Sequence, residues 1–137
     1  MDYRNHIKEG SMLNTPPVFA VYICMLTLRW LQQLGGVAAI EKINTEKATL
    51  LYNEIDENPL FKGTVAVEDR SKMNVCFVMN DVAHEEPFLN FAKQNSIVGI
   101  KGHRLVGGFR ASLYNALPLN SVKVLVDVMK EYTTKLG

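Results

Sequence analysis

The sequence has few cysteines and no excess of charge of either sign. Cys24 and Cys76 lie far apart in apolar stretches, and two cysteines are too few for a disulfide scaffold or a cysteine zinc site. We therefore expect buried free thiols in a reducing cytoplasm. Fifteen Lys and Arg residues against 14 Asp and Glu give a formal net charge of +1. This balance argues against nucleic-acid or anionic-membrane binding that is driven by bulk charge.

Long hydrophobic runs are also lacking. The most apolar stretch, Val18 to Leu28, is interrupted by Arg29, whereas a membrane span needs about 20 apolar residues. Met1 to His6 lack the apolar core of a signal peptide. The 137 residues, 47% of them hydrophobic and 21% charged, have the size and composition of one soluble domain. A chain of this length leaves little room for a complete cofactor enzyme.

The three histidines lack the partners of a metal or catalytic site. No histidine pair, and no set of histidine and carboxylate, has metal-ligand spacing, so we expect no metal. His6 and His84 are surrounded by polar residues and are interpreted as surface side chains. Cys76 and the histidines do not define a nucleophile and its base, so we interpret Cys76 as a core residue.

Hydrophobic spacing predicts four helices, at residues 17–34, 37–57, 85–94 and 121–135. The first is apolar nearly all round and is expected to be largely buried. The second is amphipathic, with Lys47 and Glu54 among its polar residues. Gly35-Gly36 and Asn58-Pro59 end these two helices.

Alternation of apolar residues and turn signals predict four strands, at residues 64–67, 74–79, 97–100 and 109–114. The order α-α-β-β-α-β-β-α indicates an α+β, two-layer fold, with a mostly antiparallel or mixed four-stranded sheet and helices on one face. The second strand, the short helix and the third strand could instead form a parallel crossover. Residues 1–16 are interpreted as an N-terminal arm or linker and residues 17–137 as the domain.

The most informative segment for chemistry is 101–112, which combines cationic side chains with glycines between two predicted strands. Arginine matches a carboxylate or phosphate with two parallel hydrogen bonds, and glycines let the backbone approach a ligand closely. An anionic small-molecule site is one interpretation. The other is an exposed basic hairpin whose glycines only form the turn. Arg110 favours the site, because it interrupts a strand of apolar and small residues.

Asn14 and Thr15 precede two prolines at the start of the first long helix. Small polar residues are common helix caps, and proline fits the first helical turn. The local pattern therefore predicts a cap.

Five ordered blocks carry a resemblance that spans nearly the whole chain. They are GSMLNTPP (10–17), WLQQLGGV (30–37), RSKMNV (70–75), KGHRLVGG (101–108) and RASLYNALP (110–118). Together they resemble the C-terminal part of the phosphoserine aminotransferases, pyridoxal-phosphate enzymes of the aspartate-aminotransferase fold type. The resemblance implies the C-terminal small domain of that fold.

The resemblance also implies a function for the parent enzyme. Such enzymes are homodimers that convert phosphohydroxypyruvate and glutamate to phosphoserine and 2-oxoglutarate in serine biosynthesis, and some serve pyridoxine biosynthesis. By motif, Arg110 would bind the substrate α-carboxylate, and His103 and Arg104 would bind its phosphate. Asn14 and Thr15 would bind the cofactor phosphate in the neighbouring subunit.

The chain departs from the family in length. The family's Schiff-base lysine and the groups that hold the cofactor ring lie in a large domain upstream, and the lysines of this chain, such as Lys72 and Lys101, do not lie in that lysine's motif. We therefore expect an inactive C-terminal fragment with no catalytic residue of its own. A free-standing anion-binding or dimerisation module that has lost catalysis is the alternative.

Overall fold

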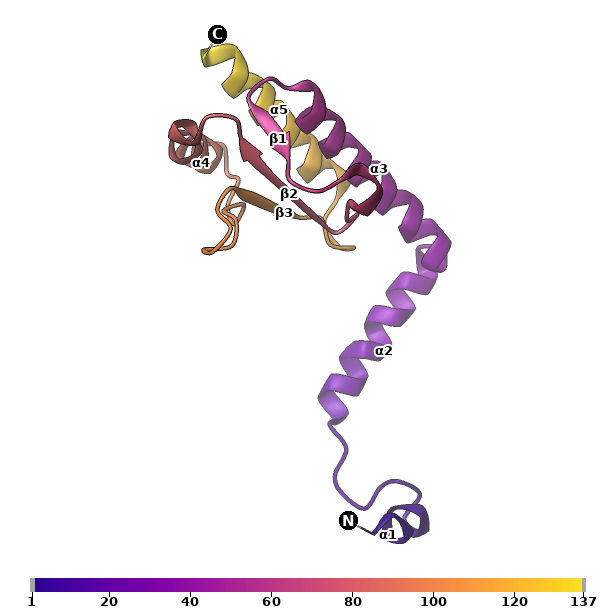
Figure 1. The fold of residues 1–137 in the computed structure, drawn as a ribbon. Coiled ribbons are helices and arrows are strands. Elements are labelled where there is room, and N and C mark those ends of the chain that lie inside the picture. Colours follow the sequence, from indigo (N-terminus) through magenta and orange to yellow (C-terminus); the bar gives the residue numbers. More distant parts are fainter. Residues whose placement is uncertain (1, 137) are drawn as a thin grey trace. The chain divides into compact units, whose positions relative to one another are not determined.

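The computed structural model describes residues 2–136, and the chain divides into two compact units, Met1–Ala39 and Ile40–Gly137. The first unit contains α1 (Tyr3–Lys8) and α2 (Val18–Gln33), and α3 (Gly36–Glu57) begins at its end. The expected aperiodic arm contains the short helix α1, because the side chain of Asp2 accepts a hydrogen bond from the Arg4 amide and caps it. Figure 1 shows these elements along the chain.

The start of α2 differs from the predicted cap. Its N-cap is Pro17, and no side chain caps the helix, so the prediction that Asn14 or Thr15 does so is wrong. The end of α2 follows the prediction, because Gly35 and Gly36 have φ angles of +101° and +76°, which glycine adopts most easily.

The expected burial of α2 is also wrong, because no residue of this helix is buried. The side chains of Phe19 and Tyr22 are 78% and 53% exposed. Cys24 is exposed and Cys76 only half-buried, which corrects the expectation of two buried thiols. An apolar pattern all round a helix indicates that every side of the helix avoids water. The pattern does not identify the residues that cover those sides.

The second unit is built on a three-stranded antiparallel sheet in the order β1-β2-β3. The strands are β1 (Phe61–Gly63), β2 (Asn74–Met79) and β3 (Phe109–Ser112). Phe61 pairs with Met79, and Cys76 pairs with Arg110. The α+β fold class is confirmed, with three strands within residues 2–136 where four were expected.

Two predicted strands need correction. The first lies at Phe61–Gly63 and not at 64–67, where the chain turns into the short helix η1 (Val67–Asp69). Residues 97–100 do not form a strand, because Gly99 has a φ of +75° that breaks the extended backbone. Their link to β3 is one bond, from the Arg110 amide to the carbonyl of Ile100 at 2.8 Å. The parallel crossover is therefore not formed.

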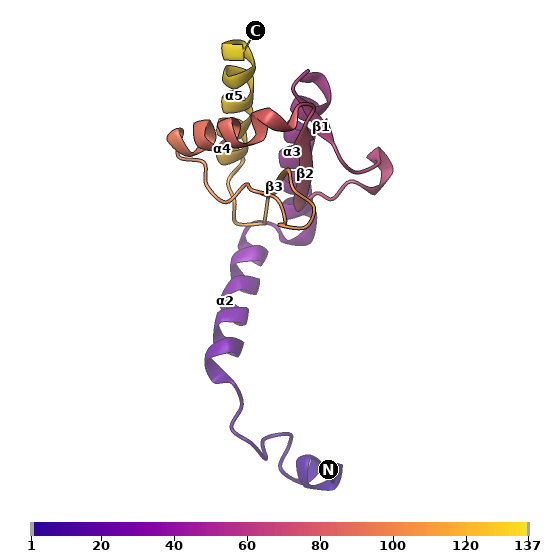
Figure 2. The same cartoon turned by 60° about the vertical axis from the view of Figure 1, so that its left-hand side comes forward.

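The helices of this unit pack on one face of the sheet, as predicted. Buried residues alternate along the strands, so that Phe77 and Phe109 face the core while Cys76 and Arg110 face away from it. The helices α3, α4 (Glu85–Gln94) and α5 (Leu119–Leu136) all contribute to this core. Figure 2 shows α4 crossing α5. The ring centroids of Phe88, on α4, and Tyr132, on α5, lie 5.2 Å apart.

The polar side of α3 is not all exposed. Lys47 and Glu54 are buried, which corrects the expectation that they lie on the solvent face. Glu54 accepts a hydrogen bond from the side-chain amide of Asn58 at 2.7 Å, and this bond satisfies one of its buried oxygens. Within residues 2–136 no single helix is long and apolar enough to cross a membrane.

Candidate functional site: a hairpin and an open sheet face

The segment 101–109 forms a hairpin that leads into β3. Lys101 bridges to Phe109, and the Gly102 amide donates to the carbonyl of Gly108 at 2.8 Å. At the tip, the amides of Val106 and Gly107 both donate to the carbonyl of His103, at 2.9 and 2.8 Å. The hairpin therefore has a defined turn that carries His103 and Arg104.

The glycines have a structural role in this hairpin. A Cβ atom on Gly102 would collide with the carbonyl oxygen of Gly107, and one on Gly108 would lie 2.7 Å from the carbonyl oxygen of Phe77. Gly107 and Gly108 also have φ angles of +78° and +59°, which favour glycine. These constraints account for the glycines as turn formers, and they leave the cationic side chains to be explained.

Those side chains are exposed. His103 and Arg104 lie at the hairpin tip, where the Nδ1 atom of His103 accepts a hydrogen bond from the Leu105 amide at 3.3 Å. Arg110 lies on β3, on the face of the sheet that the helices leave open. Within residues 2–136, the guanidinium of Arg110 makes no hydrogen bond or ion pair, so it is available to an anion.

Asn14 and Thr15 belong to the other unit. Both are exposed and lie in the irregular segment that precedes α2. Among the described residues neither side chain has a hydrogen-bond partner, and the amide of Val18 at the helix start donates to the carbonyl of Pro16 at 2.8 Å. A free hydroxyl and a free amide beside a helix start suit a phosphate group.

The lysines differ in their suitability for bonding to a cofactor. Lys72 pairs with Glu41 at 3.2 Å on the surface, and Lys101 is exposed on the hairpin. Lys47 is fully buried, and all its donors point to backbone oxygens. Lys72 and Lys47 therefore already have partners among the described residues.

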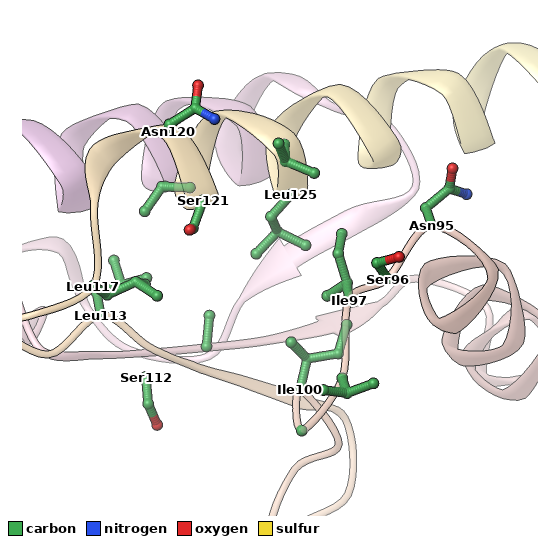
Figure 3. Close-up of a pocket in the computed structure, with 15 residues that line it drawn as sticks. Asn95, Ser96, Ile97, Ile100, Ser112, Leu113, Leu117, Asn120, Ser121 and Leu125 are labelled. Carbon is green, nitrogen blue, oxygen red and sulfur yellow. The ribbon is translucent and has the colours of Figure 1, made fainter.

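A pocket of about 400 Å³ lies in the second unit, between β3, the segment 95–100 and the start of α5 (Figure 3). Its walls are mostly aliphatic, with Ile97, Leu113 and Leu125 among them. None of the predicted site residues lines it. The cationic hairpin and Arg110 thus form a separate surface feature.

Asn44 and Lys47 were not predicted as important, although they are buried on α3. The side-chain amide of Asn44 and the ammonium of Lys47 donate hydrogen bonds to the segment 113–117 that follows β3. The signal in the sequence is their spacing, because residues 40, 44, 47, 48, 51 and 55 are buried at helical intervals. A polar side chain on such a face needs a partner inside the protein.

Comparison with known proteins shows the family to which this chain belongs. The class-V aminotransferase family matches residues 1–125. The chain therefore belongs to the class-V aminotransferase family.

Curated relatives are more specific. The chain is 59% identical over 136 residues to a phosphoserine aminotransferase of Flavobacterium johnsoniae, and 56% identical over 137 residues to one of Porphyromonas gingivalis. These alignments cover 99% and 98% of this chain and 38% of each relative. The chain thus spans little more than a third of the length of these relatives.

Solved structures agree. A phosphoserine aminotransferase from Bacillus circulans subsp. alkalophilus matches with a TM-score of 0.89 and 38% identity, over 98% of this chain and 38% of its own. A phosphoserine aminotransferase from Trichomonas vaginalis, solved with pyridoxal phosphate bound, matches with a TM-score of 0.82 and 42% identity, over 94% of this chain and 37% of its own. The fold described above is therefore that of part of these phosphoserine aminotransferases.

Proposed function

We propose that this chain is the C-terminal small domain of a phosphoserine aminotransferase, with residues 17–137 as the domain and residues 1–16 as an arm that leads into it. The observation that carries the proposal is the guanidinium of Arg110, exposed on the open sheet face and without a partner within residues 2–136, in a chain of which 99% aligns with such an enzyme. The parent enzyme transfers the amino group between glutamate and phosphohydroxypyruvate, as a step of serine biosynthesis.

In this proposal Arg110 binds the α-carboxylate that both amino-acid substrates share. Its planar guanidinium can donate two parallel hydrogen bonds to a carboxylate, and no partner within residues 2–136 competes for them. His103 and Arg104 bind the substrate phosphate from the hairpin tip.

Asn14 and Thr15 bind the phosphate of pyridoxal phosphate in the active site of the neighbouring subunit of a homodimer. The cofactor, when bound, supplies the electron sink for transamination. The residues of this chain bind and orient anionic groups, and the lysine that bonds to the cofactor belongs to the large domain. We therefore infer that this chain alone has no transaminase activity and that its parent is a cytoplasmic enzyme, which also accepts the related substrate of pyridoxine biosynthesis.

The reading frame upstream of Met1 tests the assignment to a longer enzyme. We expect it to continue into a domain that carries the cofactor lysine. The full-length protein is then expected to convert phosphohydroxypyruvate with glutamate, measured as 2-oxoglutarate release. A full-length protein that binds the cofactor but turns over only unphosphorylated oxo acids would contradict the substrate assignment.

Pyridoxal phosphate added to the 137-residue chain tests where catalysis resides. We expect no stoichiometric change in the cofactor's visible absorbance that glutamate then reverses. Sustained turnover by the chain alone would overturn the proposal that the catalytic lysine lies elsewhere. A stop codon directly upstream would favour the free-standing anion-binding module.

A further inference from the structure

Lys47 holds the segment that follows β3. Its Nζ atom donates to the carbonyls of Leu113 at 3.1 Å, Tyr114 at 2.9 Å and Leu117 at 3.1 Å. A lysine ammonium has three donors and no acceptor, so every donor is used. The side chain is fully buried, and among the described residues no carboxylate pairs with it. Three carbonyl dipoles take the place of water around this charge.

Asn44 contacts the same segment from one helical turn earlier on α3. Its Nδ2 atom donates to the Oδ1 atom of Asn115 at 2.8 Å, and the residue is buried. Residues three apart on a helix lie on the same face. The two side chains therefore fix residues 113–117 against α3 at several points.

The segment they hold directly continues the strand that carries Arg110. β3 has only four residues and pairs along its length with β2, while on its other side Phe109 bridges to Lys101 and the Arg110 amide donates to the carbonyl of Ile100. Phe109 and Ala111 of this strand are buried, and a slip by one residue would turn every side chain to the opposite face. Such a slip would turn Arg110 toward the core and away from the open face.

Contacts at the end of β3 prevent this slip from both sides. The Leu113 amide donates to the carbonyl of Met73 at 2.7 Å, while its own carbonyl accepts from Lys47. On the open face, the hydroxyl of Ser112 donates to the side-chain oxygen of Asn74 at 3.1 Å. The strand is thus anchored three residues or fewer beyond Arg110.

We propose that Lys47, supported by Asn44, is a positioning residue that fixes the register of β3 and thereby holds the Arg110 guanidinium on the open face of the sheet. The inference rests on the proposed function, because it assigns Lys47 to the same carboxylate site. It adds a residue that touches neither substrate nor cofactor and that acts only through Arg110.

A double-mutant cycle in the full-length enzyme tests this proposal. Lys47→Met keeps the length of the side chain and removes its three donors. With Arg110 present, we expect Lys47→Met to lower kcat/KM for glutamate about tenfold, through KM more than kcat. In the Arg110→Gln background the same change should alter kcat/KM less than about twofold, because the group to be positioned is gone. Lys42→Met, an exposed lysine on the same helix, is the matched control and should change neither value.

Equal losses from Lys47→Met in the two backgrounds would overturn the proposal, because a general loss of stability does not depend on Arg110. Should Lys47→Met give no soluble enzyme, Asn44→Ala enters the same cycle, and the same two outcomes decide. Failure of the proposed function has a different signature: Arg110→Gln alone would then leave kcat/KM for glutamate unchanged.

Discussion

Cys76 and Arg110 lie directly opposite each other on β2 and β3, and both side chains are on the face that the helices leave open. Directly opposed residues of an antiparallel pair have Cβ atoms about 5 Å apart. A group placed at position 76 is therefore within reach of the guanidinium.

This pairing predicts the effect of a competing carboxylate. Cys76→Glu should pair with Arg110 and occupy the hydrogen bonds that a substrate carboxylate would use. In the full-length enzyme we expect KM to rise roughly tenfold for both glutamate and phosphoserine, since about 1.4 kcal/mol corresponds to a factor of ten. Cys76→Gln has nearly the same shape without the charge and serves as the control. A rise in KM for Cys76→Gln as large as that for Cys76→Glu would contradict the competition.

The hairpin geometry predicts a difference between two of its glycines. Gly102→Ala should cost about 1–3 kcal/mol of unfolding free energy, because its Cβ atom would collide with the carbonyl of Gly107 and break the bond from the Gly102 amide to Gly108. Gly107→Asn should cost little, since nothing lies within 4 Å of a Cβ atom there and asparagine tolerates a positive φ. Urea denaturation followed by circular dichroism measures both. Equal destabilisation of the two variants would contradict the described hairpin.

An ion pair beside β1 predicts a pH dependence of stability. Arg70 donates two hydrogen bonds to Asp56, at 2.6 and 2.7 Å, and its guanidinium lies 4.5 Å from the ring centre of Tyr52. These bonds from Arg70 lower the pKa of the Asp56 carboxyl below its ordinary value of 3.8. Because the carboxyl is nearly half exposed, water screens the pair, and Asp56→Asn should cost only about 1 kcal/mol.

The direction of the pH dependence of stability follows from the lowered pKa of Asp56. The folded state binds the Asp56 proton less tightly than the unfolded state, so the stabilisation is fully present above the ordinary pKa of 3.8 and is lost as the pH falls through the lower folded value. The difference in unfolding free energy between Asp56→Asn and the unaltered chain should therefore be present at about pH 6 and shrink as the pH falls below 3.8. A difference that persists unchanged in acid would show that the ion pair is not its source.

The exposed apolar surface of α2 predicts self-association of the 137-residue chain. Contiguous exposed apolar side chains mark contact surfaces, and Phe19 and Tyr22 are large and exposed. Sedimentation velocity should show concentration-dependent association that Phe19→Ser and Tyr22→Ser weaken. Gln33→Ser, at an exposed polar position of the same helix, should not. A chain that stays monomeric at high concentration would contradict this prediction.

The sequence predicted the elements with strong periodic signals. The bounds of α4 were predicted without error. Each end of α2, α3 and α5 lies within two residues of its predicted position. The segment 97–100 was harder, because its apolar residues match a strand, and the pattern does not reveal that Gly99 has a φ of +75°. The burial of α2 was mispredicted because hydrophobicity indicates that a surface avoids water and does not reveal which molecule covers it.

Some residues of the site could be predicted from the sequence, and others could not. The exposed positions of Arg110, His103 and Arg104 agree with the cationic signal of segment 101–112, and their roles as clamps stay predictions. Lys47 was missed because a single lysine among charged neighbours is typical of a solvent-exposed face. The three carbonyls that hold it lie more than 60 positions away and come together with α3 only in the folded chain.

The central claim is that Arg110 binds the carboxylate common to both substrates while the hairpin binds the phosphate of one. Steady-state kinetics of the full-length enzyme with Arg110→Gln and Arg104→Gln, each with glutamate and with phosphoserine, test it most directly. Losing a hydrogen bond to a charged group costs roughly 1.5–3 kcal/mol, or about tenfold or more in kcat/KM. Arg110→Gln should lose this factor with both substrates, and Arg104→Gln with phosphoserine alone. Equal losses from both variants with both substrates would contradict the account.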